Sequence, residues 1–89
     1  MEHEDRATRI KRLRMRAARR GTREMDLVLM GFAREDLAGL DPAQLDAFEA
    51  LLEENDQDLY AWISGQSEAP ARHAAILSRI AARLPGGAT

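Results

Sequence analysis

The sequence predicts an all-α fold, a compact bundle of about five short helices. Apolar residues recur at intervals of three and four along most of the chain, as expected for amphipathic helices. Clear helix-start signals lie inside the chain, and no alternating run of β-branched residues favours a strand. With 89 residues, we expect a single domain with one modest core, ordered over about residues 6–84 and frayed at both termini.

The first predicted helix begins near Arg6 and is apolar on one narrow side only. That side carries small and medium residues, namely Ala7, Ile10, Leu13 and Ala17. Arginines recur at helical spacing at Arg9, Arg12, Arg16, Arg19 and Arg23. They would form one continuous stripe only if the helix passed through Gly21. Glycine costs about 1 kcal/mol relative to alanine inside a helix and often ends one, so we expect a break or tight junction at Gly21.

The second predicted helix, from Glu24 to Phe32, is expected to form the centre of the core. Its apolar residues are so numerous that we expect burial on more than one side: Met25, Leu27, Val28, Leu29, Met30 and Phe32. Two acids in its first turn, Glu24 and Asp26, suit the positive end of the helix dipole. Residues 34–40 are predicted to form a loop or short turn.

The third predicted helix has the clearest start in the chain. Asp41 is placed as its cap, Pro42 as its first residue, and Gln44 as the second member of a capping box. Its expected inner face consists of Leu45, Phe48, Leu51 and Leu52.

Two further helices complete the predicted bundle. Polar residues 55–58 supply caps for a short fourth helix, in which we expect Tyr60 and Trp62 to pack in the core and Gly65 to form the end. Residues 67–70 open a fifth helix. Its core positions are expected to be Ile76, Leu77, Ile80 and Leu84, and residues 85–87, Pro-Gly-Gly, stop it.

Charge is sorted along the chain in two blocks. Residues 6–23 hold nine positive side chains and no acid, whereas residues 24–68 hold twelve acids and one base, Arg34. This pattern suggests a polarised surface for a partner. The net charge of -2 argues against a general nucleic-acid binder. The basic first helix nevertheless leaves open a nucleic-acid-binding regulator, and a regulator that inhibits another protein also stays open.

Composition and motifs argue against an enzyme. The chain has no cysteine, and its two histidines, His3 and His73, lack a companion at metal-ligand spacing. No glycine-rich phosphate loop is present. We therefore expect no catalytic residue and no metal site. No segment reaches the roughly 18 apolar residues of a membrane span, and the acidic first residues are unlike a signal peptide, so we expect a soluble cytoplasmic protein without membrane contact.

Several segments together resemble the succinate dehydrogenase assembly factor family, whose members are also called flavinators. The segments are Arg-Arg-Gly-Thr-Arg-Glu-Met-Asp-Leu at 19–27, Phe32, Leu-Leu-Glu at 51–53, and Asp-Gln-Asp-Leu-Tyr-Ala-Trp-Ile at 56–63. The resemblance covers about residues 6–80. Members are small helical proteins that assist covalent attachment of FAD to the flavoprotein subunit of succinate dehydrogenase and fumarate reductase.

The resemblance implies a docking surface for that flavoprotein around Arg20, Gly21 and Glu24. We add the neighbouring arginines Arg16, Arg19 and Arg23, which belong to the basic run. Gly21 could serve the turn, close contact with the partner, or both. Arg20 could offer its fork of donors to the partner. Glu24 could receive a partner cation or orient Arg20 or Arg23. No cofactor is expected on this chain, since FAD belongs to the partner.

Overall fold

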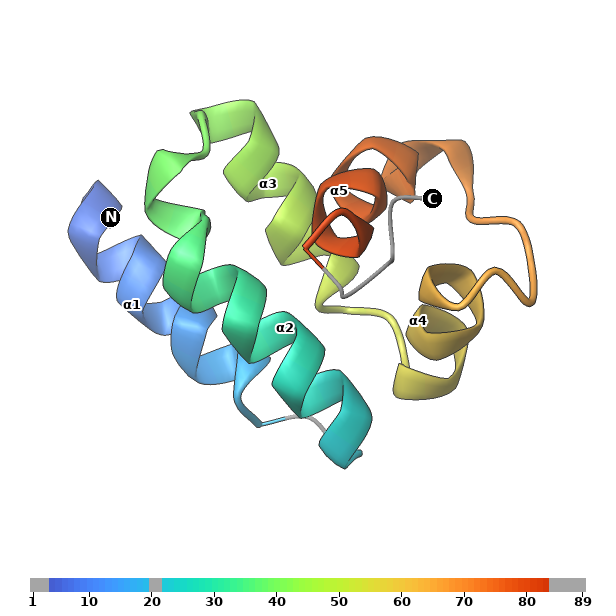
Figure 1. The fold of residues 1–89 in the computed structure, drawn as a ribbon. Coiled ribbons are helices and arrows are strands. Elements are labelled where there is room, and N and C mark those ends of the chain that lie inside the picture. The colour runs from blue at the N-terminus through green and yellow to red at the C-terminus, as the bar shows by residue number, and fades with distance from the viewer. Residues whose placement is uncertain (1–3, 20–21, 84–89) are drawn as a thin grey trace.

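The computed structural model describes residues 4–19 and 22–83, and within them the fold is entirely helical (Figure 1). The helices are α1 (Arg6–Ala17), α2 (Arg23–Glu35), α3 (Pro42–Leu51), α4 (Asp56–Ile63) and α5 (Ala71–Ala81), and a short 3-10 turn, η1 (Leu37–Gly39), precedes α3. The predicted fold class is therefore confirmed. In the described part of the chain, no helix is long and apolar enough to cross a membrane.

The helices form two groups that share one core. Helices α1 and α2 lie side by side, while α5 packs against α3, α4 and α2 (Figure 1). At the centre are Phe32 of α2 and Phe48 of α3, whose ring centroids are 5.5 Å apart. Leu13, Leu37 and Leu59 reach the same core with no exposed surface, so every part of the fold contributes to it.

Local sequence signals account for the helix starts. Asp5 caps α1 by accepting a hydrogen bond from the backbone N–H of Thr8, 2.8 Å away. The expected capping box on α3 is present, because Asp41 and Gln44 each accept the other's backbone N–H, at 2.8 and 2.9 Å. Asn55 caps α4 in the same way. The left-handed φ of 84° at Gly65 confirms the expected role of this glycine just beyond α4.

The second helix differs from its prediction in length and burial. It continues to Glu35, so Arg34 is helical and not part of a loop. Leu27 is 58% exposed, although we expected burial on more than one side. The helix buries one stripe, formed by Met25, Leu29, Phe32 and Ala33. Helix α2 packs against α1, η1, α4 and α5. Leu27 lies outside the buried stripe and therefore faces outward.

The two aromatic residues of α4 also divide between core and surface. Trp62 packs against the core and lies 5.5 Å, ring to ring, from His73 of α5. Tyr60 is 47% exposed, so its expected core role is wrong. His73 is fully buried, and its Nε2 lies 2.8 Å from a carboxylate oxygen of Glu54. This contact joins α5 to the segment after α3, so His73 has a structural role. Leu84 and residues 85–87 lie outside the described residues.

Candidate functional site

The predicted docking surface lies at the junction between α1 and α2. Helix α1 ends at Ala17, and α2 begins at Arg23 with Thr22 as its N-cap in extended conformation. The expected break between two helices is therefore present. Arg20 and Gly21, the centre of the predicted motif, lie outside the described residues.

Asp56, the first residue of α4, is bonded directly to the start of α2. Its carboxylate accepts a hydrogen bond from the backbone N–H of Thr22 at 3.1 Å, and the Thr22 hydroxyl lies 3.5 Å from the same oxygen. Thr22 makes no side-chain cap of its own to α2. The N-termini of α2 and α4 both favour a negative charge, each by roughly 0.3–1 kcal/mol. Asp56 therefore positions the junction against α4.

An open groove of about 290 Å³ lies beside this contact. It is lined by Thr22, Glu24, Asp56, Gln57 and Tyr60. Two carboxylates and an exposed tyrosine make it negative and rich in hydrogen-bonding groups, which suits a cation or an amide donor from another molecule. We call it the junction groove.

Glu24 is exposed on the rim of the junction groove. It forms no ion pair with Arg23, or with any other side chain in the described part of the chain. Of the roles left open for Glu24, orientation of Arg23 is therefore absent from this structure, and orientation of Arg20 concerns a residue outside the described part of the chain. Reception of a partner cation stays a prediction. Arg19 and Arg23 are also exposed at the junction.

Arg16 is placed differently from the other predicted docking residues. Its guanidinium lies 2.8 Å from Glu53, next to the C-terminal end of α3. Arg9 and Arg12 are held in the same way, because both bond to Glu49 of α3 at 2.9 Å. The basic stripe of α1 therefore faces an acidic side of α3.

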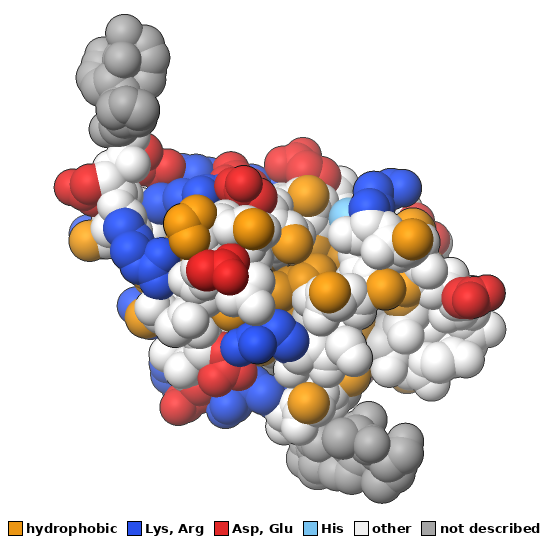
Figure 2. Space-filling model, turned by 90° about the horizontal axis from the view of Figure 1, so that it is seen from above, with side chains coloured by type: hydrophobic (Ala, Val, Ile, Leu, Met, Phe, Trp, Pro, Cys, Tyr) orange, Lys and Arg blue, Asp and Glu red, His pale blue; other side chains and the backbone are white. Residues whose placement is uncertain are grey.

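These ion pairs change the charge pattern expected from the sequence. Figure 2 shows acidic and basic side chains interspersed over the face seen from above, rather than gathered into two regions. The hydrogen bond from Arg12, with a further one from Arg9, lowers the pKa of Glu49 below its ordinary value. The pKa of Arg9 is raised chiefly by its hydrogen bond to Asp46, and that of Arg12 chiefly by its hydrogen bond to Glu4, with Glu49 adding to both. Part of the charge that suggested a polarised surface is thus neutralised inside the molecule.

Sequence reasoning missed Asp56 as part of this site. It assigned the acids after Asn55 to helix capping, and Asn55 does perform that task by accepting the backbone N–H of Asp58 at 2.8 Å. The sequence does carry one indication of this contact, because a helix start needs only one capping side chain and Asn55 provides it, which leaves Asp56 without a capping task. The residue that Asp56 bonds to, Thr22, lies 34 residues away in the sequence.

No group of three or more metal-ligating side chains is assembled in residues 4–19 and 22–83.

Comparison with known proteins identifies the family. The family model described as flavinator of succinate dehydrogenase matches residues 11–84, which include the whole junction. The chain belongs to this family. The family model thus confirms the resemblance inferred from the motif and its downstream segments.

Curated relatives of the family occur in fungi and bacteria. "Succinate dehydrogenase assembly factor 2, mitochondrial" of Mycosarcoma maydis is 42% identical over 73 residues, which are 82% of this chain and 31% of that protein. "FAD assembly factor SdhE" of Legionella pneumophila (strain Lens) is 48% identical over 50 residues, 56% of this chain and 63% of that protein. A Vibrio cholerae protein of the same name is 47% identical over 49 residues, 55% and 57% of the two chains. The chain thus spans about a third to two thirds of these relatives.

Proposed function

We propose that this protein is an assembly factor that binds the flavoprotein subunit of succinate dehydrogenase and promotes covalent attachment of FAD to that subunit. Membership of a family described as flavinators of succinate dehydrogenase supports the proposal, as do relatives named as assembly factors. The flavoprotein of fumarate reductase is a second client under the same proposal. The chain acts in the cytoplasm as a single domain, contacts no membrane, is not itself an enzyme, and binds no cofactor, because FAD belongs to the client.

The observation that carries the proposal is the exposed junction held by Asp56. Arg19, Arg23 and Glu24 are exposed around Thr22, whose backbone is bonded to α4, so part of the backbone of this surface is positioned before a client binds. Together with Arg20 and Gly21, they form the proposed docking surface. Arg16 acts at its margin, because its guanidinium is already bonded to Glu53.

Such a factor would act by binding energy. The client's own side chain forms the bond to the flavin, and the factor favours the client conformation in which that bond can form. It shifts this equilibrium only by its difference in affinity for the two conformations, about 1.4 kcal/mol for each tenfold change. A charged surface beside Thr22, whose backbone is bonded to Asp56, offers such a difference, since it fits one arrangement of client donors and acceptors better than another.

The structure gives little support to nucleic-acid binding. Three of the arginines that would contact phosphates, Arg9, Arg12 and Arg16, are bonded to carboxylates of this same chain. A nucleic acid would have to displace those carboxylates first. Binding to nucleic acid is therefore not part of the proposed function.

Deletion of the gene tests the proposed function directly. We expect the flavoprotein of the deletion strain to carry little covalent FAD, seen as loss of in-gel flavin fluorescence under denaturing conditions. The wild-type gene should restore it, and a Gly21→Arg variant should not, while keeping its helical circular dichroism. Gly39→Arg is the matched control, because a side chain at Gly39 meets open space. Normal covalent flavin in the deletion strain would overturn the proposal.

A further inference from the structure

Beyond Arg6, which donates to the backbone carbonyls of Ala38 and Leu40, the positive side chains of α1 divide into two groups that face different surroundings. Arg9, Arg12 and Arg16 are bonded to carboxylates, chiefly those of α3. Lys11 and Arg14, which lie between them in the sequence, form no ion pair within the described residues. The charge of this second group is therefore available to another molecule.

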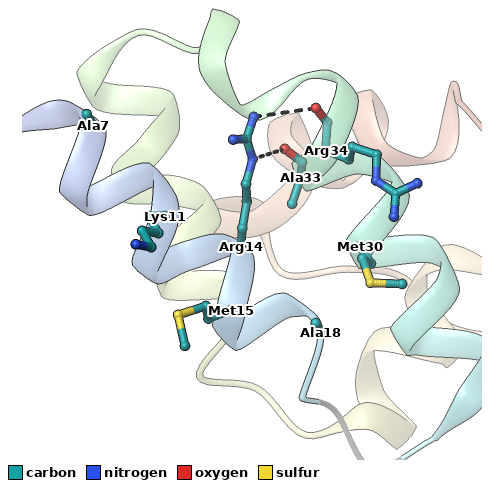
Figure 3. A pocket seen from close by; sticks show the side chains of 8 residues that line it. All are labelled: Ala7, Lys11, Arg14, Met15, Ala18, Met30, Ala33 and Arg34. Carbon is teal, nitrogen blue, oxygen red and sulfur yellow. Dashed lines mark hydrogen bonds between the residues drawn. The ribbon is translucent and has the colours of Figure 1, made fainter.

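Arg14 brings its charge to the C-terminal end of α2. Its guanidinium donates to the backbone carbonyl of Ala33 at 3.0 Å and to that of Arg34 at 3.4 Å. Figure 3 shows both hydrogen bonds spanning the space between the two helices. Carbonyls orient the guanidinium without supplying the full counter-charge of a carboxylate. Arg34 itself is exposed and forms no ion pair in the described part of the chain.

These cations surround an apolar groove between α1 and α2. The groove has a volume of about 570 Å³, and its apolar lining, here called its floor, consists of Met15, Met30 and the alanines among the residues labelled in Figure 3. Met15 is 50% exposed. The volume lies in the range of pockets that bind drug-sized ligands. Methionine side chains adapt to apolar partners of varied shape, and therefore suit such a floor. We call this feature the methionine groove.

The methionine groove is separate from the junction groove. The two share no lining residue, and they carry opposite charge, basic here and acidic at the junction. A client held at the junction alone would leave the methionine groove unoccupied. The groove therefore represents a second potential contact on the same protein.

We propose that the methionine groove binds an acidic segment of the flavoprotein client, with apolar side chains against Met15 and Met30 and carboxylates against Lys11, Arg14 and Arg34. The charge and the apolar floor define this kind of ligand. The choice of the flavoprotein as its source rests on the proposed function. A phosphate backbone would satisfy the cations and leave the floor uncovered, and a flat lipid surface fits a concave site poorly.

Defined peptides test the chemistry of the groove without the client. The probe is a fluorescein-labelled helical peptide with leucine on one face and glutamate on the other. Two control peptides replace leucine by serine or glutamate by lysine. We expect the first peptide to bind, measured by fluorescence anisotropy, and each control to bind at least about tenfold more weakly, since each lacks one of the two interactions. Equal binding of the three peptides would contradict the proposal, as would stronger binding of duplex DNA or anionic vesicles.

Methyl signals locate the bound peptide. In protein labelled at the methionine methyl groups, we expect the peptide to shift the signals of Met15 and Met30. The signal of Met25 should stay in place because this residue is buried in the core. A shift of Met25 alone would place the peptide elsewhere and overturn the assignment.

Matched variants then separate the two interactions. Lys11→Glu should weaken peptide binding about tenfold at low salt, and Arg79→Glu on α5, with the same change in charge, should not. Met15→Ser should weaken it at every salt concentration. Its control is Leu27→Ser, because Leu27 is another exposed apolar residue and lies outside the groove. Equal effects of variant and control would contradict the proposal.

The client experiment distinguishes failure of this inference from failure of the proposed function. Wild-type protein is first shown to bind the purified flavoprotein and to restore covalent flavin in the deletion strain. If the wild-type protein neither bound the flavoprotein nor restored covalent flavin, the proposed function would be refuted. The flavoprotein would then also be refuted as the source of the acidic segment. If both occur, Met15→Ser should lower affinity for the flavoprotein while Leu27→Ser leaves it unchanged. Full affinity of Met15→Ser would refute the methionine groove alone.

Discussion

Asp56 is a carboxylate of α4 that supports the junction between α1 and α2. It lies in the first turn of α4, yet it accepts the backbone N–H of Thr22, the residue at the N-cap position of α2. A hydrogen bond to a charged group contributes about 1.5–3 kcal/mol when buried and less when water competes. Since Thr22 is exposed, we place this contact at the lower end. Its main consequence is the position of the junction.

Asp56→Ala should therefore loosen the junction with a modest loss of stability. We expect the free energy of unfolding, measured with urea, to fall by about 1–2 kcal/mol. The Thr22 amide should exchange with solvent faster, because its acceptor is lost. Asp58→Ala is the control, since Asp58 has the same charge, lies on the same helix turn and contacts Asn55. Unchanged exchange at Thr22 in Asp56→Ala would show that the hydrogen bond does not hold the junction in solution.

At the scale of elements, the contact between α1 and α3 depends on paired charges. Glu49 lies at its centre, between Arg9 and Arg12, and its side chain is only 30% exposed. Exposed ion pairs contribute little individually, but a carboxylate shared by two arginines forms a network. The lowered pKa of Glu49 shows that the folded state favours its charged form. Folding and ionisation of Glu49 are therefore linked.

This linkage predicts the pH dependence of stability. Glu49 has a lower pKa in the folded protein than its ordinary value of 4.5, so its contribution is fully present above that value. It is lost as the pH falls through the lowered pKa. We expect Glu49→Gln to cost about 1 kcal/mol near neutral pH and low salt, and the difference from wild type to shrink below about pH 4.5 and at high salt.

Thermal or urea unfolding across a pH series measures this difference. Asp46→Asn is a useful comparison, because Asp46 bonds only to Arg9 among these arginines and its side chain is 72% exposed. Its effect should be the smaller of the two. A difference between wild type and Glu49→Gln that stayed constant down to the acid limit would contradict the linkage.

The same elements show which parts of the structure a sequence can predict. The capping box of Asp41 and Gln44 was predictable because its members are three residues apart and their geometry is local. The bond from Arg9 to Glu49 spans 40 residues, and it depends on how α1 and α3 are rotated and packed. Helical periodicity placed Arg9, Arg12 and Arg16 on one stripe correctly, but it could not identify what that stripe faces.

For the whole molecule, folding rearranges a charge pattern that is simple in the sequence. Three arginines of the basic run, Arg9, Arg12 and Arg16, meet carboxylates of the acidic run where α1 lies against α3. Two charged surfaces that stay exposed are the negative junction groove and the positive methionine groove. The family could be inferred from residues 19–27 and 56–63, because each of these segments is contiguous in the sequence. The methionine groove could not, since its lining comes from two helices whose spacing is set by packing.

Two charge reversals on these grooves test whether association depends on local surfaces or on net charge. Glu24→Lys raises the formal net charge of -2 by two, and Lys11→Glu lowers it by two, so the double variant has the charge of the wild type. We expect each single variant to weaken binding of the flavoprotein at low salt. Because the grooves share no lining residue, the losses in binding free energy should add to within about 0.5 kcal/mol in the double variant. Titration calorimetry of all four proteins gives the comparison. If net charge governed association, the double variant would recover wild-type affinity; with two separate local surfaces, it binds most weakly of the four.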